Sequence, residues 1–517
     1  MKKRVLLLFA LALSFANFAQ GDKTKDVVDV IKKHGIENSK VMDIASWMID
    51  VYGQRLTGST GLANAEEWAK AELTKMGLKN AHLEEWTEFG RGWDMTHFEM
   101  HAEAPTYWPI IAYPKAWSSP TKGTGEVIYL NVESMSDLAK YKGKLSGKFV
   151  LMESIRPVEE AFEATAKRHD SESLLELANA TLPVPRGPRG GGGDSSAADL
   201  RQATWELLEA EKPIGVLDRS YKGDLGTVFV SGARTADGSA RDNDKYVVPQ
   251  MTLAIEHYNR IFRMLDKGVP VTLSVDAQSN YTNRDGNEYN VIAEIPGTDL
   301  KDEVVMFGAH FDSWHAGTGA TDNGSGSSVM MEAARILVET IKETGIQPRR
   351  TLRIALWTGE EQGLFGSRKY VGEHYANVDG FSVSSLKQDQ KKVSAYYNMD
   401  NGTGKLRGVY LQGNEAVSPI FREWLQPFHD MDAKTLSLGN TGGTDHLAFD
   451  GAGIPGFQFI QEPISYGTKT HHSNMDNYDH LVADDLKQAA SIIAYFVWQT
   501  SQRDEQIPRK AIDKKYD

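Results

Sequence analysis

Short apolar runs alternate with longer helical segments between residues 289 and 501, and this alternation limits the possible folds more than any other feature of the sequence. The apolar runs predict strands at 290–295, 304–311, 351–357, 393–399, 408–411 and 456–460. The segments between them predict helices at 325–344, 366–376, 415–427 and 484–501. Near-continuously apolar strands that alternate with helices predict an α/β fold, with a mostly parallel central sheet covered by helices on both faces.

Residues 119–280 have a different sequence pattern. It predicts a series of short strands, at 125–130, 148–152, 213–217, 247–251 and 271–275. A loop rich in Pro, Gly and Arg is expected at 183–193. No metal-ligating or nucleophilic constellation is apparent in this region. The sequence therefore predicts a main domain formed by residues 20–118 and 281–517, with an inserted smaller β-rich α/β domain at 119–280.

The N-terminus has the pattern of a secretory signal. Lys2-Lys3-Arg4 precedes an apolar run at 5–13, and small residues follow at Ser14, Ala16 and Ala19. A retained anchor is the alternative, but the run is shorter than the ~20 residues that a membrane span needs. We expect a signal peptide at 1–19, a secreted or periplasmic protein, and no membrane association after signal cleavage.

Composition excludes some chemistry. The chain has no cysteine, so disulfides and thiolate metal ligands are excluded. The net charge of −13 argues against nucleic acid as a partner.

Acidic and imidazole side chains gather where the predicted strands end. His310 and Asp312 end one strand, and a glycine-rich turn with Asp322 follows. Three further strands are followed by acidic or imidazole residues, namely Glu360 and Glu361, Asp400, and His472. Each has an ordinary explanation alone, such as a surface pair, a solvated helix start or a turn. Because ligand sites lie outside the carboxyl ends of strands in open α/β sheets, their joint placement predicts a metal site.

Residues 290–500 resemble the M28 family of co-catalytic di-zinc aminopeptidases and carboxypeptidases. The resemblance rests on Ala309-His310-Phe311-Asp312-Ser313, Ala320-Thr321-Asp322-Asn323-Gly324-Ser325-Gly326, Gly359-Glu360-Glu361-Gln362-Gly363-Leu364-Phe365-Gly366-Ser367, Asn398-Met399-Asp400 and His472-Ser473-Asn474-Met475-Asp476. Arg55-Leu56-Thr57-Gly58-Ser59 is also similar to the N-terminal part of this zinc exopeptidase fold, and residues 119–280 are similar to an inserted protease-associated domain.

The resemblance implies two zinc ions per chain. Asp322 would bridge them, with His310 and Asp400 on one ion and Glu361 and His472 on the other. Glu360 would be the general base toward a metal-activated water, and Asp312 would accept a hydrogen bond from the imidazole of His310. Asp476 would do the same for His472.

Substrate-binding residues are less well defined. Asp445 and His446 lie in a segment that resembles the family's pocket lining. His471 stands where many members have a tyrosine thought to stabilise the oxyanion. His471, Tyr466 or His446 would supply that hydrogen bond, or the contribution is missing.

Three functions are weighed. The first is an exported exopeptidase acting on free N-termini, dipeptides or C-termini, and the segment Gly359–Leu364 favours it. The second is a glutaminyl-peptide cyclotransferase with one zinc on the same scaffold. The third is a non-catalytic binding protein, against which the complete ligand set argues. Peptide substrates are the expected partners, and a homodimer is left open.

Overall fold

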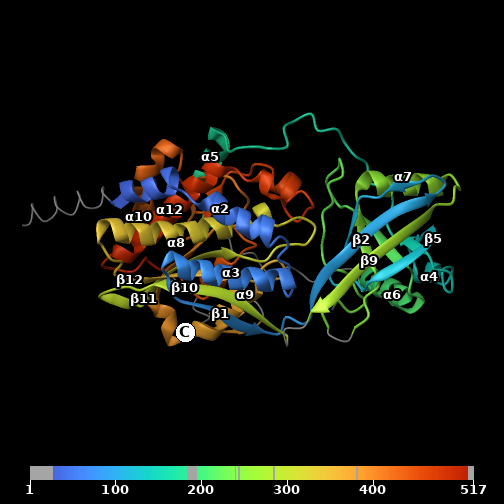
Figure 1. The fold of residues 1–517 in the computed structure, drawn as a ribbon, viewed down its shortest axis with the longest axis horizontal. Helices are drawn as coiled ribbons and strands as arrows, with labels where there is room; N and C mark the ends of the chain where they lie inside the picture. Colours follow the sequence, from blue (N-terminus) through green and yellow to red (C-terminus); the bar gives the residue numbers. More distant parts are fainter. Residues whose placement is uncertain are drawn as a thin grey trace, which may run out of the picture.

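The computed structural model describes residues 27–182, 195–238, 240–242, 245–282, 286–379 and 382–510. The expected signal peptide at 1–19 and the expected loop at 183–193 lie outside the described residues. None of the helices in the described part is long and apolar enough to cross a bilayer. Two lobes stand side by side (Figure 1). We call residues 27–87 and 286–510 the main lobe and residues 92–282 the second lobe.

An eight-stranded sheet forms the centre of the main lobe, in the order β1-β10-β12-β11-β15-β18-β16-β17. Its strands are β1 (Lys79–Thr87), β10 (Asn287–Ile295), β11 (Leu300–His310), β12 (Arg350–Trp357), β15 (Val393–Asn398), β16 (Leu406–Tyr410), β17 (Thr435–Ser437) and β18 (Gly456–Gln461). The four neighbours β12, β11, β15 and β18 run parallel to one another. β1 and β10 add antiparallel strands at one edge, and β16 pairs antiparallel with β18 at the other. The predicted parallel sheet is therefore present as the centre of a mixed sheet.

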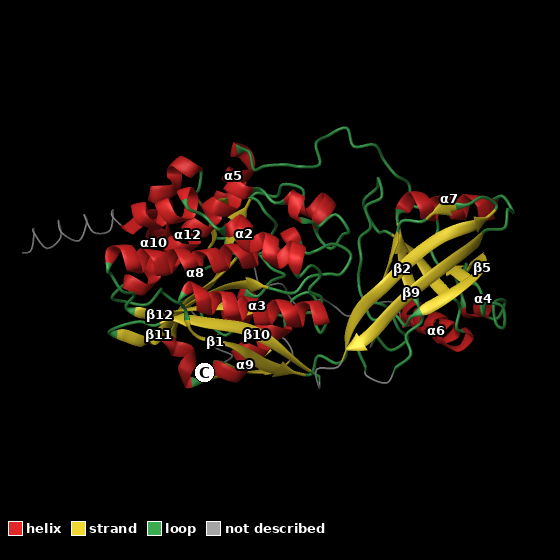
Figure 2. Ribbon diagram, in the orientation of Figure 1, coloured by secondary structure: helices red, strands yellow, loops and turns green. Residues whose placement is uncertain are grey.

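Helices cover both faces of this sheet, as the sequence predicted (Figure 2). The helices on one face are α2 (Val41–Ser46), α3 (Thr60–Met76), α8 (Ser325–Thr344), α10 (Ser418–Leu425) and α12 (Ala483–Gln502). The other face carries α9 (Phe365–His374) and α11 (His446–Gly451). A small hairpin of β13 (Ala376–Asp379) and β14 (Ser382–Leu386) follows α9. Short π-helical or 3₁₀-helical turns lie at Lys33–Glu37, Trp47–Val51, Ala320–Gly324, Gln388–Lys392, Glu415–Val417, Gln426–Met431, Tyr466–Thr470 and Tyr478–His480.

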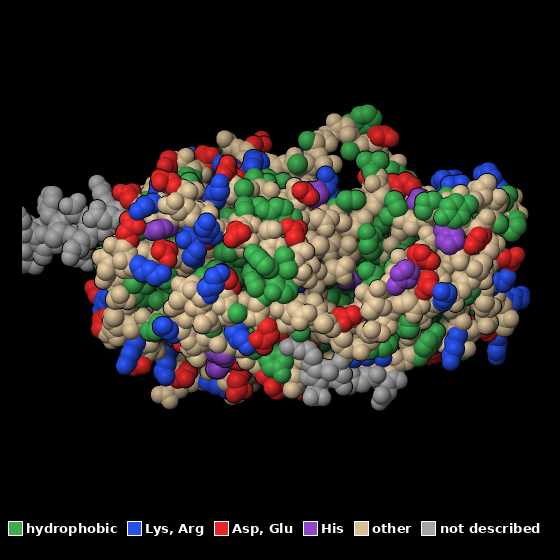
Figure 3. Space-filling model, in the orientation of Figure 1, with side chains coloured by type: hydrophobic (Ala, Val, Ile, Leu, Met, Phe, Trp, Pro, Cys, Tyr) green, Lys and Arg blue, Asp and Glu red, His purple; other side chains and the backbone are tan. Residues whose placement is uncertain are grey.

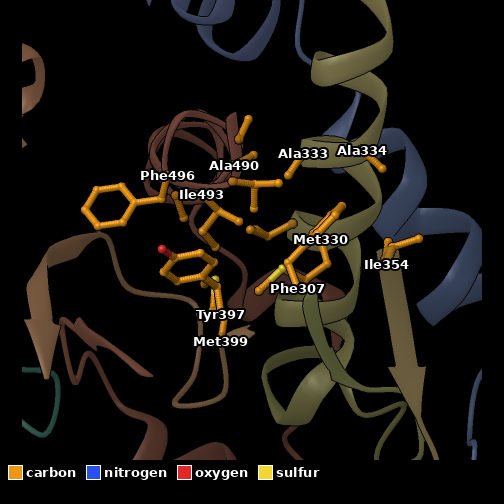
Figure 4. Packing of buried hydrophobic residues seen from close by; sticks show 14 of the residues in the cluster. Phe307, Met330, Ala333, Ala334, Ile354, Tyr397, Met399, Ala490, Ile493 and Phe496 are labelled. Carbon is orange, nitrogen blue, oxygen red and sulfur yellow. The ribbon is translucent and has the colours of Figure 1, made fainter. Parts of the chain in front are cut away.

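The largest core lies between the sheet and the pair α8 and α12. Met330 and Ala333 of α8 and Ile493 and Phe496 of α12 pack over the sheet (Figure 4). The side chains beneath them are Phe307, Ile354 and Tyr397 of the strands and Met399, which follows β15. Each fully buried large apolar side chain stabilises the fold by roughly 1.5–3 kcal/mol. This packing fixes the positions of the parallel strand ends relative to one another.

The second lobe is built on its own eight-stranded sheet, in the order β3-β2-β9-β5-β6-β7-β8-β4. Its strands are β2 (Gly92–Ala104), β3 (Trp108–Pro109), β4 (Ala112–Pro114), β5 (Thr121–Tyr129), β6 (Phe149–Leu151), β7 (Gly215–Arg219), β8 (Gln250–Leu253) and β9 (Thr272–Thr282), with helices α4 (Met135–Leu138), α6 (Ser195–Glu211) and α7 (Ile255–Asp266). α7 was not predicted, although Ile255, Tyr258 and Ile261 on one side of it are buried. β2, β3 and β4 precede residue 119 and join this sheet, and the domain boundaries given above stay a prediction.

One segment of the second lobe returns to the main lobe. Residues 152–182 form a long connection that ends in α5 (Ser171–Ala178), which packs against β17 (Figure 1). The backbone N–H of Lys167 donates to the carbonyl of Ile464 at 2.9 Å, and Arg168 pairs with Asp485 at 2.8 Å. The second lobe is therefore attached to the loop that follows β18.

Candidate metal centre

The four parallel strands carry the predicted ligands to one edge of the main sheet. His310 is the last residue of β11, and Asp322 lies in the turn Ala320–Gly324 that follows. Glu360 and Glu361 follow β12, Asp400 follows β15, and His472 follows the turn Tyr466–Thr470 after β18. Since the strands are neighbours and parallel, their carboxyl ends meet.

Asp322 lies between two imidazoles. Its Oδ1 is 3.3 Å from Nε2 of His310, and its Oδ2 is 3.3 Å from Nε2 of His472. Asp400 lies on the side of His310, with Oδ1 at 3.3 Å from Nε2. Glu361 lies on the other side, with Oε2 at 2.9 Å from Nε2 of His472. One carboxylate thus faces two groups of ligand atoms.

The donor atoms fit a metal ion. Among the described side chains, those of the predicted ligands include four buried atoms without a hydrogen-bond partner, namely His310 Nε2, Asp322 Oδ2, Glu361 Oε1 and Asp400 Oδ1. Ligand atoms of His310, Asp322 and Glu361 lie within 4.8 Å of one another, as do those of His310, Glu360 and Asp400. Unpaired buried polar atoms are costly, and imidazole nitrogens with carboxylate oxygens are the ligands that zinc accepts.

The charges of the buried side chains at this site also favour the binding of a cation. Burial raises the pKa of Glu361 well above its usual value, and the neighbouring Asp322 raises it further. Burial would lower the pKa of His310, but Asp400 and Glu360 outweigh it and raise that pKa. The carboxylates therefore repel one another and attract positive charge, and a divalent ion would offset this repulsion.

Asp312 holds the segment after β12. Its carboxylate accepts from the hydroxyl of Thr57 at 2.8 Å and from the backbone N–H groups of Glu360 and Glu361 at 3.3 Å each. Its Oδ1 is 3.7 Å from Nδ1 of His310, and the Asp312 carbonyl is nearer, at 3.1 Å. Asp312 thus touches both the imidazole and the two glutamates.

Asp476 supports the turn of Asp322 rather than His472. It accepts from the backbone N–H of Thr321 at 2.7 Å and from that of Asp322 at 3.0 Å. The turn then enters α8 at Gly326, where a Cβ atom would stand 2.3 Å from the carbonyl of Met399. Only glycine permits this approach, so the start of α8 lies directly behind the site.

Arg55 is a structural contributor whose role the sequence did not reveal. Its buried guanidinium donates to the carbonyls of Phe311 at 2.7 Å, Gly53 at 2.8 Å, Thr318 at 3.0 Å and Gly319 at 3.0 Å. It therefore ties the segment before α3 to the loop between His310 and Asp322. The only signal was its place in Arg55–Ser59, which resembles the N-terminal part of the M28 fold.

His471, His472 and Tyr466 lie at the partly exposed side of the centre. The His471 and His472 side chains are 34% and 28% exposed, against 1% for His310. Their rings stack with centroids 3.7 Å apart, and Nε2 of His471 is 3.9 Å from Asp322. The hydroxyl of Tyr466 donates to Oδ1 of Asp322 at 2.9 Å.

The structure places Asp445 and His446 differently from each other. Asp445 is fully buried, and its pKa rises to about 7 because of burial, while the nearby Asp400 and Asp312 raise it further. His446 turns away, and its Nε2 contacts Gln412 and the carbonyl of Thr441. Asp445 thus belongs to the acidic surroundings of the centre, and the imidazole of His446 is engaged elsewhere.

Comparison with known proteins agrees with this geometry. The model of "Peptidase family M28" matches residues 290–497, the part of the chain that contains all five predicted ligands. Carboxypeptidase Q of Mus musculus is 25% identical over 468 residues, which cover 89% of this chain and 86% of that protein. Carboxypeptidase Q of Homo sapiens is 24% identical over 495 residues, with 95% and 91% covered.

Solved structures share the fold. A peptidase M28 precursor from Shewanella amazonensis has a TM-score of 0.66 at 21% identity, covering 95% of this chain and all of that one (100%). BSAP, a zinc aminopeptidase from Bacillus subtilis, has a TM-score of 0.56 at 18% identity, covering 90% and 95%. Residues 290–497 belong to peptidase family M28, and the protein is a metallo-exopeptidase.

Proposed function

We propose that this protein is an exported exopeptidase with two zinc ions, which hydrolyses terminal peptide bonds of short peptides. The observation that carries the proposal is the position of Asp322, whose two oxygens each lie 3.3 Å from a different imidazole. A carboxylate placed in this way is suited to bridge two cations. The basic and apolar N-terminal pattern supports the export.

The ligand assignment follows the two sides of Asp322. His310 and Asp400 would hold one ion with Oδ1, and Glu361 and His472 would hold the other with Oδ2. His471 also lies near Asp322, and it is the one alternative to His472 within the described ligand groups. The shorter contacts of His472 favour His472 as the ligand.

Glu360 is the proposed general base. Bound zinc would supply Lewis acidity toward the scissile carbonyl and acidify a water molecule. Glu360 is 9% exposed, and its Oε2 lies 4.0 Å from Nε2 of His310, at the edge of the ligand group. Burial raises its pKa, as do Asp400 and Asp445, so the carboxylate readily accepts a proton from water and passes it to the leaving amine.

Tyr466 is the proposed hydrogen-bond donor to the oxyanion. Its hydroxyl already reaches the centre at Asp322, whereas the imidazole of His446 contacts Gln412 and Thr441. Burial raises the pKa of Tyr466, and Asp322 raises it further, so the phenol keeps its proton and can donate.

The Glu360→Gln substitution tests the function. We expect zinc content equal to that of the wild type and a fall in kcat of roughly 10²- to 10⁴-fold, because only proton transfer is removed. Glu339→Gln is the matched control, since Glu339 pairs with Lys342 on α8, away from the site. Unchanged hydrolysis by Glu360→Gln would reject the assignment.

Product analysis separates the alternative chemistry. Peptides that begin with glutamine should lose a terminal residue, and mass spectrometry of the products should show the added water. Formation of a cyclised N-terminus with loss of ammonia would instead identify a cyclotransferase.

A further inference from the structure

The sheet of the second lobe curls almost into a barrel and leaves one seam. Its two end strands, β3 and β4, are separated in the chain by only Ile110 and Ile111. The chain therefore passes directly from one end of the sheet to the other, and these ends lie close together. Since β3 pairs with β2 and β4 pairs with β8, the seam lies between β2 and β4.

The outer edge of β2 is paired at one end of the seam. On its inner edge β2 pairs with β9 along its whole length (Figure 1). Within the described residues, its ladder with β3 covers only His101 and Ala102. The N–H of Ile110 adds a bond to the carbonyl of Met100 at 3.0 Å, and the chain then leaves β2 to join β8. The hairpin of β2 and its return strand is therefore splayed open.

A groove of about 600 Å³ occupies the seam, and its walls are residues 95–100 and 110–113. This volume falls in the range in which proteins bind ligands. Residues 95–100 span roughly 20 Å at about 3.3 Å per residue, and Thr96, His97 and Glu99 among them are exposed. The seam is therefore open to solvent and long enough for a segment of extended chain.

Backbone polar groups point into the groove from both walls, because the groups of successive strand residues alternate between the two edges. The carbonyl of Met100 points toward β3, so that of Phe98 points the same way, as the register with β9 does not shift between them. On the opposite wall the carbonyl of Ile111 accepts from Ala254 at 2.9 Å on the side of β8, so the backbone groups of Ala112 point toward β2. An extended chain in the groove meets donors and acceptors on both sides.

The groove leads to the junction of the lobes. Met95 lines the groove and also a second hollow of about 310 Å³, which His315 lines from the main lobe. His315 lies in the loop between β11 and α8, and its Nε2 donates to the carbonyl of Pro114, the last residue of β4, at 2.7 Å. Both walls of the seam therefore end beside a loop of the lobe that carries the metal centre. Because the protein is a metallo-exopeptidase, peptides are the extended chains that it meets.

The edge of β2 is suited to a single peptide rather than to the sheet of a second copy. The register with β9 shifts between Met95 and His97, and His97 and Glu99 stand exposed on the edge. A bulge and polar side chains discourage pairing with a long flat edge. A short flexible peptide can follow the local bend.

We propose that the seam between β2 and β4 binds a free peptide in the extended conformation, which adds a strand to β2 and completes the ring of strands in the second lobe. Backbone hydrogen bonds supply most of the affinity, and alternate side chains of the peptide pack beside Phe98 and the buried Met100 and Ile110. The seam is a peptide-binding site apart from the metal centre, and it does not depend on the number of zinc ions.

An end-blocked peptide tests this site, because the acetyl and amide groups prevent terminal hydrolysis. The probe is acetyl-Lys-Thr-Val-Thr-Val-Thr-Lys amide, added to the zinc-loaded wild type. Isothermal titration should show saturable binding of one peptide per chain. Hydrogen exchange followed by mass spectrometry should show slower exchange of the amides at 95–100 and 110–113 when the peptide is bound. N-methylation of the central valine should weaken binding roughly 3- to 10-fold, because it removes one backbone donor.

Ile111→Asp tests the wall of the groove. Ile111 is 42% exposed and lines the groove, so a carboxylate there should weaken binding of the peptide roughly 10-fold. Met135→Asp is the matched control, since Met135 is a 59% exposed apolar residue of the same lobe at the start of α4. Both variants should keep the thermal midpoint of the wild type and its hydrolysis of the dipeptide Ala-Leu. If no form cleaves Ala-Leu or any other short peptide, the proposed function fails, and the binding experiment still decides the role of the seam.

Absence of saturable binding would overturn the inference, as would equal affinity for the N-methylated peptide or slower exchange confined to amides outside the two walls. Slower exchange of the same amides without peptide, growing with protein concentration, would place a second copy in the seam and would also overturn it.

Discussion

Arg55→Met removes the side chain that ties the loop between His310 and Asp322 to the N-terminal part of the main lobe. The substitution keeps an apolar stem of similar length and deletes the guanidinium. Four backbone carbonyls then lose their donor, those of Phe311, Gly53, Thr318 and Gly319. We expect lower stability and weaker zinc binding, because this loop carries one end of the metal centre.

The magnitude follows from two opposing contributions. Each hydrogen bond from a charged donor is worth about 1.5–3 kcal/mol, so four of them give roughly 6 kcal/mol at the lower end. Burial lowers the pKa of Arg55 to about 10, and relief of this desolvation returns roughly 3 kcal/mol at 1.36 kcal/mol per pKa unit. The net loss should be about 3–5 kcal/mol, as for other broken buried charge contacts.

Urea unfolding of the metal-free protein measures the stability, and competition with a zinc chelator measures the dissociation constant. Arg350→Met is the matched control. Arg350 is equally buried and donates to the carbonyls of Thr500 at 3.2 Å and Arg503 at 2.5 Å. It is the first residue of β12, so it lies at the amino end of that strand, whereas the metal centre lies at the carboxyl ends. Arg350→Met should destabilise the fold and leave zinc affinity unchanged. A loss below about 1 kcal/mol for Arg55→Met, with wild-type zinc affinity, would refute the reasoning.

Three further predictions concern single side chains. His472→Ala should remove one equivalent of zinc, measured by plasma mass spectrometry, whereas His471→Ala should retain both; the reverse result would exchange their roles. Tyr466→Phe should keep the metals and lower kcat by roughly 10- to 10³-fold with little change in KM, and an unchanged kcat would exclude the hydroxyl as the oxyanion donor. Burial lowers the pKa of His315 to about 4, so the folded state binds fewer protons than the unfolded state between pH 4 and 6.5, and stability falls as the pH falls through this window. The contribution lost between pH 7 and 4.5 is about 2.5 kcal/mol, and His315→Gln should show a pH dependence reduced by that amount in urea unfolding. An identical pH dependence in the variant would contradict the buried neutral imidazole.

The sequence predicted the centre of the fold because apolar runs long enough to be buried on both faces have few other solutions. β11, β12, β15 and β18 are such runs, and helices were expected where α8 and α12 lie. Short or exposed elements carry little pattern, and β17 and the hairpin of β13 and β14 were therefore missed. Figure 3 shows acidic and basic side chains mixed over both lobes on the visible face.

The sequence predicted which residues belong to the candidate site, but it did not predict the contacts between them. The positions of the acidic and imidazole residues at strand ends indicated which residues would lie close together. The order of the strands in the sheet is set by tertiary packing and could not be predicted from the sequence. The place of Asp322 between His310 and His472 depends on that order. Asp476 illustrates the difference. The resemblance suggested a bond to His472, and the structure places its carboxylate on the N–H groups of Thr321 and Asp322. In the main lobe the sheet supplies the rigid frame, and the second lobe contacts the loop of His472 through the segment Val228–Val230.

Zinc titration of the metal-free protein, followed by peptide hydrolysis and metal analysis on the same samples, tests the central claim most directly. The account predicts two equivalents of bound zinc per chain, with hydrolysis of short peptides reaching its maximum as the second equivalent binds. Full activity with a single equivalent, or binding of two equivalents without any cleavage of terminal peptide bonds, would contradict it.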